Sequence, residues 1–228
     1  MILMNCILSY VFLFLYLIAA VLNLAGTEKG REKLFKFTKP ALLLLLCLYC
    51  LFRTLPSPDL LIIAAIVACW LGDVLLMIDG EAWFTAGGVS FFAGHVLLIL
   101  VFARQTDISR VPLVFLIPAA ALYVTAAGFV MARARKTAPL TMQIPMLLYL
   151  FCNAAMNLFA LSRLLESPGI WQAVSYVGAI LFFLSDCALF LLRYDNERKS
   201  LFKTDFFVML TYICGVLFIT LGLVPPIK

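Results

Sequence analysis

Apolar stretches of transmembrane length follow one another along the whole chain, and this succession restricts the fold more than any other feature. A helix needs about 20 apolar residues to cross the hydrocarbon core of a bilayer. The breaks between the stretches are short and carry charged residues, proline or glycine. The helices that this pattern predicts span residues 2–24, 40–52, 59–78, 83–103, 110–131, 139–163, 168–193 and 204–223. We therefore predict an all-α fold, a polytopic membrane protein whose single domain, 1–228, is an eight-helix transmembrane bundle.

The composition excludes a soluble domain and a nucleic-acid partner. The 228 residues are 65% hydrophobic and 13% charged, with a mean hydropathy of +1.10, whereas soluble domains are about 45–50% apolar and about 25% charged. Eight spans of about 20 residues each leave only short loops and tails. The net charge of +5 comes from Lys and Arg residues spread over these loops, whereas a nucleic-acid-binding protein gathers them on one basic face.

The seven cysteines do not indicate a disulfide framework. All of them fall inside apolar runs, where a free cysteine behaves as a small hydrophobic residue. Cys47 and Cys50 form a C-x-x-C motif, but the leucine-rich sequence around them lacks the βαβ context of a redox site. We favour a structural role for this pair over a redox role.

The distribution of Lys and Arg between alternate loops predicts the orientation in the membrane. The first apolar run has no basic residue before it and is longer than the core of a signal peptide, so we interpret it as a retained helix. The loops after the first, fifth and seventh expected helices carry 12 basic residues, including Arg198, Lys199 and Lys203, and the opposite side carries five, including Lys228. Cytoplasmic loops hold the excess of positive charge. We therefore expect both termini to be non-cytoplasmic, in a bacterial inner (plasma) membrane or, alternatively, in an internal eukaryotic membrane.

A short internal similarity joins the third and the seventh expected helices. The sequence LGDVLL of residues 71–76 resembles LSDCAL of residues 184–189, at a separation of 113 residues, which is close to half of the chain. Two four-helix halves would place both helices in the same direction and both aspartates at a similar depth. A 4+4 internal duplication is therefore one hypothesis for the organisation of the chain.

Asp73 and Asp186 are the only acidic residues well inside the expected helices. A carboxylate in hydrocarbon costs about 3 kcal/mol on insertion scales, so it usually faces the bundle interior and marks a functional site. The alternative is a structural ion pair or hydrogen bond between helices, and the lack of any Lys or Arg in mid-helix weakens it. In one shared cavity, one of the two carboxyls would stay protonated, which provides a general acid beside a general base. The same pair would also serve a proton-coupled carrier.

His95 is the only histidine, and it follows a stripe of small residues formed by Ala86, Ser90 and Gly94. Such a stripe permits close packing of helices in a membrane. A hydrogen bond across that contact and a functional role are equally good interpretations of His95. One histidine, with cysteines in lipid-like runs, argues against a zinc site.

Polar residues lie on one face of the sixth expected helix. Tyr149, Asn153 and Asn157 are spaced i, i+4 and i+8, so they share a face that we expect in the bundle interior. They either bind a polar group of a substrate or join helices, and we slightly favour the second. On the seventh helix, Ser185 lies next to Asp186 and is placed to tune it.

With these residues identified, the chain resembles the YhhN-like lysoplasmalogenase family of polytopic membrane proteins. The matching stretches are WLGDVLLMID (70–79), FFAGHVLL (91–98), Tyr149 to Met156, and VGAILFFLSDCALFLLRY (177–194). Their order, together with the eight-helix layout, extends the resemblance over most of the chain.

The resemblance implies hydrolysis of the vinyl ether bond of lysoplasmalogens, which releases a fatty aldehyde and glycerophosphocholine or glycerophosphoethanolamine. It assigns the two catalytic acidic positions to Asp73 and Asp186 and the family histidine to His95. Substrate-binding candidates are His95, Ser185, Tyr149, Asn153 and Asn157. A vinyl ether is cleaved after a carboxylic acid protonates its β-carbon, so no metal or organic cofactor is expected, and the partners are the lipid substrate, water and membrane lipids.

Two other classes of function remain as alternatives. A small proton-coupled membrane transporter would use the same aspartates as a proton relay, and it would need the alternating access that repeats usually provide. The other is a receptor-like or purely structural bundle. It is less favoured, because two carboxylates inside the membrane are energetically costly and such a bundle has no function for them.

Overall fold

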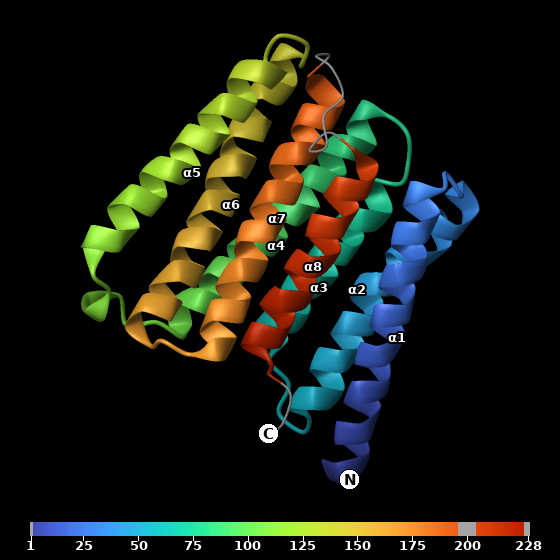
Figure 1. Ribbon diagram of the computed structural model, residues 1–228, viewed down its shortest axis with the longest axis vertical. Helices are drawn as coiled ribbons and strands as arrows, with labels where there is room; N and C mark the ends of the chain where they lie inside the picture. Colours follow the sequence, from blue (N-terminus) through green and yellow to red (C-terminus); the bar gives the residue numbers. More distant parts are fainter. Residues whose placement is uncertain (1, 196–203, 226–228) are drawn as a thin grey trace. The chain divides into compact units, whose positions relative to one another are not determined.

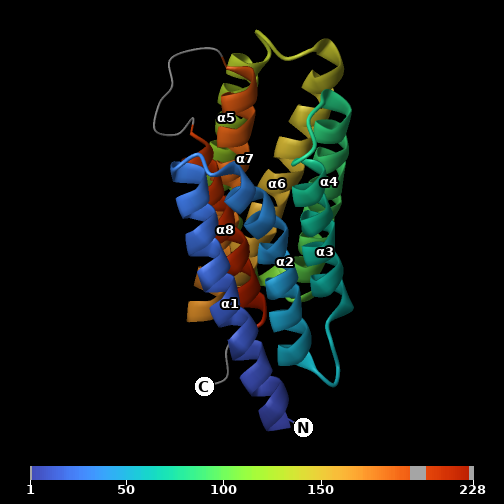
Figure 2. The same cartoon turned by 90° about the vertical axis from the view of Figure 1, so that its right-hand side faces the viewer.

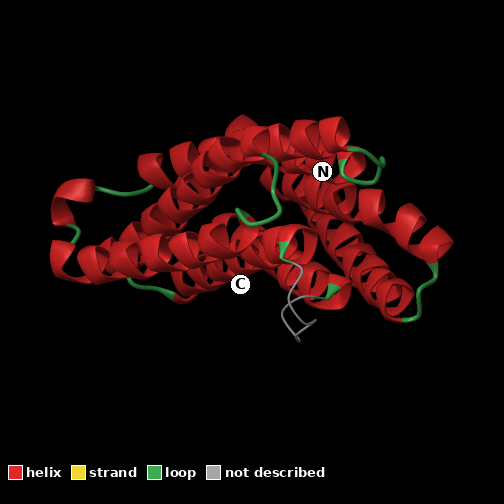
Figure 3. Cartoon of the chain, turned by 90° about the horizontal axis from the view of Figure 1, so that it is seen from above, coloured by secondary structure: helices red, strands yellow, loops and turns green. Residues whose placement is uncertain are grey.

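The computed structural model describes residues 2–195 and 204–225, and this part of the chain is helical and without a strand (Figure 3). Its elements are α1 (Ile2–Glu28), α2 (Glu32–Thr54), α3 (Leu60–Leu75), α4 (Glu81–Arg104), the 3-10 helix η1 (Ile108–Arg110), α5 (Leu113–Ala134), α6 (Leu140–Glu166), α7 (Ile170–Tyr194) and α8 (Asp205–Leu223). The predicted all-α fold with eight α-helices is confirmed. Four residues of the charge count, Arg198, Lys199, Lys203 and Lys228, lie outside the described residues.

Seven helices of the described chain are long and apolar enough to cross a membrane, so the chain is a multi-pass membrane protein. The eighth, α3, has 16 residues, which span about 24 Å, less than the roughly 30 Å of a hydrocarbon core. It stops at Leu75 and not at residue 78, because a turn at residues 76–77 follows it. Asp73 therefore lies in the last turn of α3, and the prediction that it is well inside the helix is wrong.

The largest difference from the predicted bounds is at the start of α2. This helix begins at Glu32 and not near residue 40, although its first turns are highly charged. An ion pair of 2.7 Å between Glu32 and Lys36 at the i,i+4 spacing supports the first turns, and Pro40 lies inside the helix. As a result Lys39, expected in a cytoplasmic loop, is a helical residue that is only 8% exposed.

The contacts divide the described chain into two compact units, each built from neighbouring helices (Figure 1). Unit 1 comprises residues 2–101 and 224–225, which form α1, α2, α3 and most of α4. Unit 2 comprises residues 102–223, with the end of α4, η1 and α5 to α8. The single domain and the 4+4 duplication stay predictions.

In unit 1, each helix packs against the next one along the chain. Helix α1 lies along α2 (Figure 2), where the buried Asn23 Nδ2 donates to Thr38 Oγ1 over 2.9 Å. Helix α3 contacts α2, and Ser90 Oγ of α4 donates to Ala68 O of α3 over 2.8 Å. These cross-helix bonds satisfy polar groups that would otherwise face hydrocarbon.

Two residues after α8 belong to unit 1 because α2 binds them. The buried Tyr49 hydroxyl donates to Val224 O over 2.7 Å. Arg53 donates from Nε and Nη2 to Pro225 O, over 3.1 and 2.8 Å. Both side chains lie near the C-terminal end of α2, so this end of the helix holds the segment in place.

In unit 2, α7 and α8 approach each other most closely, because small residues line their contact. A Cβ built on Gly178 would lie 2.5 Å from Ile219 N and 2.7 Å from Gly215 O. A Cβ on Gly222 would lie 2.4 Å from the Ser175 Cβ. Small residues at these positions permit the backbones to touch. The tight pair α7 and α8, with α6 packed against α7, forms the framework of this unit.

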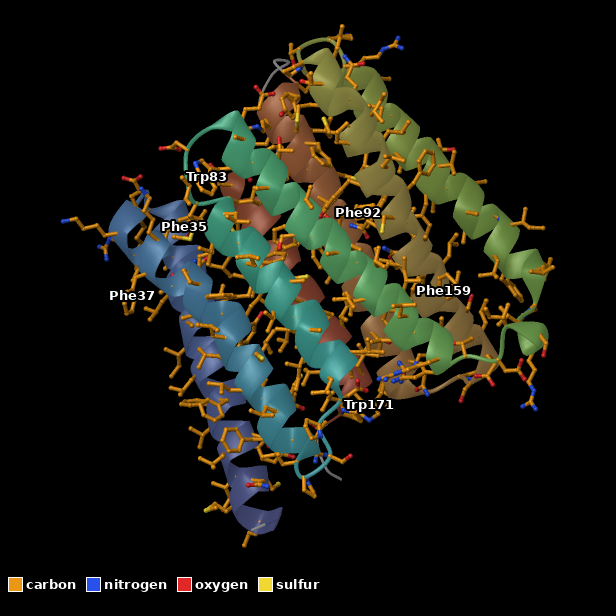
Figure 4. All side chains as sticks on the ribbon, turned by 180° about the vertical axis from the view of Figure 1, so that it is seen from behind. Phe35, Phe37, Trp83, Phe92, Phe159 and Trp171 are labelled. Atoms are coloured by element: carbon orange, nitrogen blue, oxygen red, sulfur yellow. The ribbon has the colours of Figure 1, made fainter. Side chains whose placement is uncertain are left out.

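Large apolar side chains cover the outer surfaces of the helices. Figure 4 shows Phe37 directed away from α2 and Trp83 at the start of α4; they are 81% and 44% exposed. Helix α5 similarly exposes Leu113, Val114 and Leu122. Such surfaces are suited to contact with lipid.

We expect Gly178→Ala to destabilise the protein by about 1–3 kcal/mol, since the added methyl group meets backbone atoms that cannot rotate away. The matched control is Gly128→Ala in α5, where a Cβ would meet nothing within 4 Å and replacing a helical glycine favours the helix by about 0.5–1 kcal/mol. Thermal unfolding in detergent measures both variants. Equal stability of the two would contradict the close α7–α8 contact.

Candidate functional site

The most polar part of unit 2 surrounds Asp186 on α7. This side chain is buried, with 6% of the residue exposed. Its Oδ2 accepts two hydrogen bonds from α6, one from Tyr149 OH over 2.8 Å and one from Asn153 Nδ2 over 2.6 Å. Because Tyr149 and Asn153 are four residues apart, both lie on the face of α6 that packs against α7. The structure therefore brings together three of the residues that the sequence singles out.

The hydrogen bonds continue from Asn153 away from Asp186. Asn157 Nδ2 donates to Asn153 Oδ1 and to Asn153 O, each over 3.0 Å. Asn157 Oδ1 accepts from Tyr123 OH of α5 over 3.1 Å, and Tyr176 OH lies 3.4 Å from Tyr123 OH. The two asparagines are fully buried, so these polar groups form a network inside the unit. Substrate binding by Tyr149, Asn153 and Asn157 stays a prediction.

Tyr123 is the member of this network that sequence reasoning missed. It is 6% exposed and lies in a helix of alanine, leucine and valine, most of whose large residues face outward. A single tyrosine in such a run carries no periodic signal. The one indication in the sequence is the hydroxyl of a tyrosine inside a largely apolar helix, since a buried tyrosine usually finds a hydrogen-bond partner.

Aromatic rings of α7 enclose the network on both sides of Asp186. Phe183 packs edge-on against Tyr123, with ring centroids 5.0 Å apart, and Phe190 packs edge-on against Tyr149, with centroids 5.5 Å apart. Both phenylalanines are buried. Hydrogen bonds in such an apolar surrounding are electrostatically stronger than in water.

Ser185 directs its hydroxyl group to another helix. Its Oγ donates to Val208 O of α8 over 2.9 Å, and the residue is 2% exposed. This bond connects α7 to α8 next to Asp186. The predicted roles of Ser185, in tuning Asp186 and in binding substrate, stay predictions.

In unit 1, Asp73 has a cationic neighbour that the sequence analysis did not foresee. Lys39 Nζ lies 3.6 Å from Asp73 Oδ1, and the two side chains are 10% and 2% exposed. The statement that no Lys or Arg neutralises a helical aspartate is therefore wrong for Asp73. The cause is the misplaced start of α2, which assigned Lys39 to a loop. Lys39 Nζ also lies 5.5 Å from the centre of the Phe35 ring.

His95 follows Gly94, which lies in the closely packed contact between α3 and α4. It is fully buried, and a Cβ on the preceding Gly94 would lie only 2.5 Å from Cys69 Sγ of α3. With the bond from Ser90 to Ala68, this confirms that the small-residue stripe faces a neighbouring helix. The substrate-binding role of His95 stays a prediction.

Metal-ligating residues do not gather in the part of the chain that the structure describes. No group of three or more His, Cys, Asp or Glu side chains in that part is arranged to hold a metal ion. None of the seven cysteines, all within the described ranges, forms a disulfide bond.

We expect Lys39→Met to destabilise the protein by about 3–5 kcal/mol, because it leaves the buried Asp73 carboxylate without its cation. The control is Lys36→Met on the same helix, which removes an exposed ion pair and should change the unfolding temperature little. The double variant Lys39→Met/Asp73→Asn should recover stability. Thermal unfolding in detergent tests this, and equal effects of the two single lysine variants would contradict the buried pair.

The comparison with known proteins gives one match. The YhhN family matches residues 34–223 of the chain. The match begins inside α2 and ends with α8, so it includes every residue of the Asp186 network and both Lys39 and Asp73. No match was found among curated proteins or among solved structures.

Proposed function

The chain belongs to the YhhN family, and from this premise we propose that it is a lysoplasmalogenase, an ether hydrolase. Its substrate is a 1-alkenyl-lysoglycerophosphocholine or 1-alkenyl-lysoglycerophosphoethanolamine. Water and this lipid give a fatty aldehyde and glycerophosphocholine or glycerophosphoethanolamine. The observation that carries the proposal is the buried Asp186 carboxyl, one oxygen of which is held by two donors within an apolar helix bundle.

Hydrolysis of a vinyl ether begins with protonation of carbon, so the enzyme must first of all supply a proton donor. A proton added to the β-carbon converts the double bond to an oxocarbenium ion, water adds to the cationic carbon, and the resulting hemiacetal separates into aldehyde and alcohol. A general acid must carry a proton before it can donate one. We assign this donation to Asp186, and its conjugate carboxylate then stabilises the oxocarbenium ion.

Asp73 is the second catalytic residue of the proposal. Its ion pair with Lys39 supports a charged carboxylate, the form that accepts a proton from the attacking water. The proposed substrate-binding residues are Tyr149, Asn153 and Asn157, with Ser185 and His95.

The substrate also suits the membrane setting. Asp186 precedes Arg193 by seven residues, which corresponds to about 10 Å along α7. A lysolipid with its headgroup at the membrane surface holds its ether bond at about this depth. We propose entry from the cytoplasmic leaflet of a bacterial inner membrane, with both termini non-cytoplasmic.

We expect the purified protein in detergent to release aldehyde from 1-alkenyl-lysoglycerophosphoethanolamine and none from the saturated 1-alkyl lysolipid, which has no double bond to protonate. Asp186→Asn and Asp73→Asn should each lower the rate about 100-fold or more, as loss of a general acid or base does. Aldehyde formation measures the rate. Asp107→Asn is the matched control, because Asp107 caps η1 outside the spans and its loss should leave the rate unchanged.

Two results would overturn this proposal. If neither the choline lipid nor the ethanolamine lipid released aldehyde, the hydrolase function would be excluded, and proton-coupled transport would be the function to test next. Wild-type rates in either intramembrane asparagine variant, with the folded protein eluting normally in detergent, would refute the two-carboxylate mechanism.

A further inference from the structure

We propose that Tyr123 is a positioning residue for Asp186, acting through Asn157 and Asn153 along hydrogen bonds that all donate in one direction. The inference deepens the proposed function and rests on it for its kinetic consequence alone. Tyr123 comes from α5, the two asparagines from α6 and Asp186 from α7, so three helices contribute.

Each link between these residues has hydrogen-bond geometry inside the protein. Tyr123 OH lies 3.1 Å from Asn157 Oδ1, Asn157 Nδ2 lies 3.0 Å from Asn153 Oδ1, and Asn153 Nδ2 lies 2.6 Å from Asp186 Oδ2. The asparagines have no exposed surface, and Tyr123 and Asp186 are 6% exposed. Water therefore cannot replace a lost link without a change in packing.

The direction of donation follows from the chemistry of the side chains. An amide has a donor end and an acceptor end, so an Asn153 that donates to Asp186 presents its oxygen to Asn157. Because Asn157 donates to Asn153, its own oxygen faces away from Asn153 and needs a hydrogen-bond donor as its partner. The Tyr123 hydroxyl supplies that proton. Without it, Asn157 Oδ1 loses its donor, and the reversed orientation of both amides becomes competitive.

The consequence concerns which oxygen of Asp186 carries the acidic proton. Oδ2 accepts from both Asn153 and Tyr149, so a protonated Asp186 carries its proton on Oδ1. Bonds aligned in one sense polarise one another, which strengthens the hold of Asn153 on Oδ2. Tyr123 thereby fixes the orientation of the proton donor from the far end of the chain of bonds.

The test compares Tyr123→Phe with Tyr49→Phe in the purified full-length protein. Tyr49 is likewise a buried tyrosine whose hydroxyl donates a hydrogen bond, but its bond lies in unit 1. The carboxyl stretching band of Asp186 is identified by infrared spectroscopy as the band that Asp186→Asn removes. We expect Tyr123→Phe to move this band to higher frequency, since Oδ2 is held less strongly, and Tyr49→Phe to leave it in place.

Kinetics give the second readout. We expect Tyr123→Phe to lower kcat about five- to tenfold, the effect of one buried hydrogen bond, with KM changed less than about twofold. Tyr49→Phe should keep the wild-type kcat. An unmoved band, or equal effects of the two variants on kcat, would overturn the inference and leave Tyr123 a residue that only joins helices.

Loss of folded Tyr123→Phe would not end the test. Difluorotyrosine installed at position 123 keeps the shape and donates more strongly, so the Asp186 band should move to lower frequency, and an unmoved band would again overturn the inference. If the wild-type protein hydrolyses no vinyl ether, the proposed function fails, but the infrared comparison still decides whether Tyr123 acts on Asp186.

Discussion

The absence of water in a bilayer is the constraint on which the other features depend. A polar group inside the hydrocarbon region must find its partner within the protein, because no solvent is present to supply one. The two buried aspartates meet this requirement differently. Asp73 lies beside a lysine ammonium group, whereas Asp186 accepts from a phenol and an amide. Asp73 thus has a charged partner, and the two side chains that donate to Asp186 Oδ2 are neutral.

Helix packing in unit 2 makes the Asp186 arrangement rigid. Glycines let α7 touch the backbone of α8, and the Ser185 hydroxyl joins the same two helices beside Asp186. On a neighbouring face of α7, Phe183 and Phe190 contact the tyrosines of the network. The carboxyl is thus carried by a helix that is held on two of its faces, which limits the geometries available to it.

The sequence predicted the helices well because bilayer thickness sets their length. It also placed Tyr149, Asn153 and Asn157 on one face, since i,i+4 spacing needs no knowledge of neighbours. It did not predict that Lys39 is helical, because the charged residues before Pro40 and the proline itself are typical of a loop. In the structure α2 includes this segment, and the Glu32–Lys36 ion pair supports its first turns. It missed Tyr123 because the rotation of α5 and the identity of its neighbours depend on packing between helices, which a single sequence does not encode.

The bonds from Tyr49 and Arg53 to Val224 and Pro225 make unit 1 discontinuous along the chain. Its last two described residues leave the ribosome only after all of α5 to α8, so α2 cannot complete its polar contacts during the synthesis of the first four helices. Assembly of the N-terminal helices is therefore finished after translation has passed unit 2. A fragment that ends at α4 would enter the membrane with the hydroxyl of Tyr49 and the guanidinium of Arg53 lacking these two carbonyl groups.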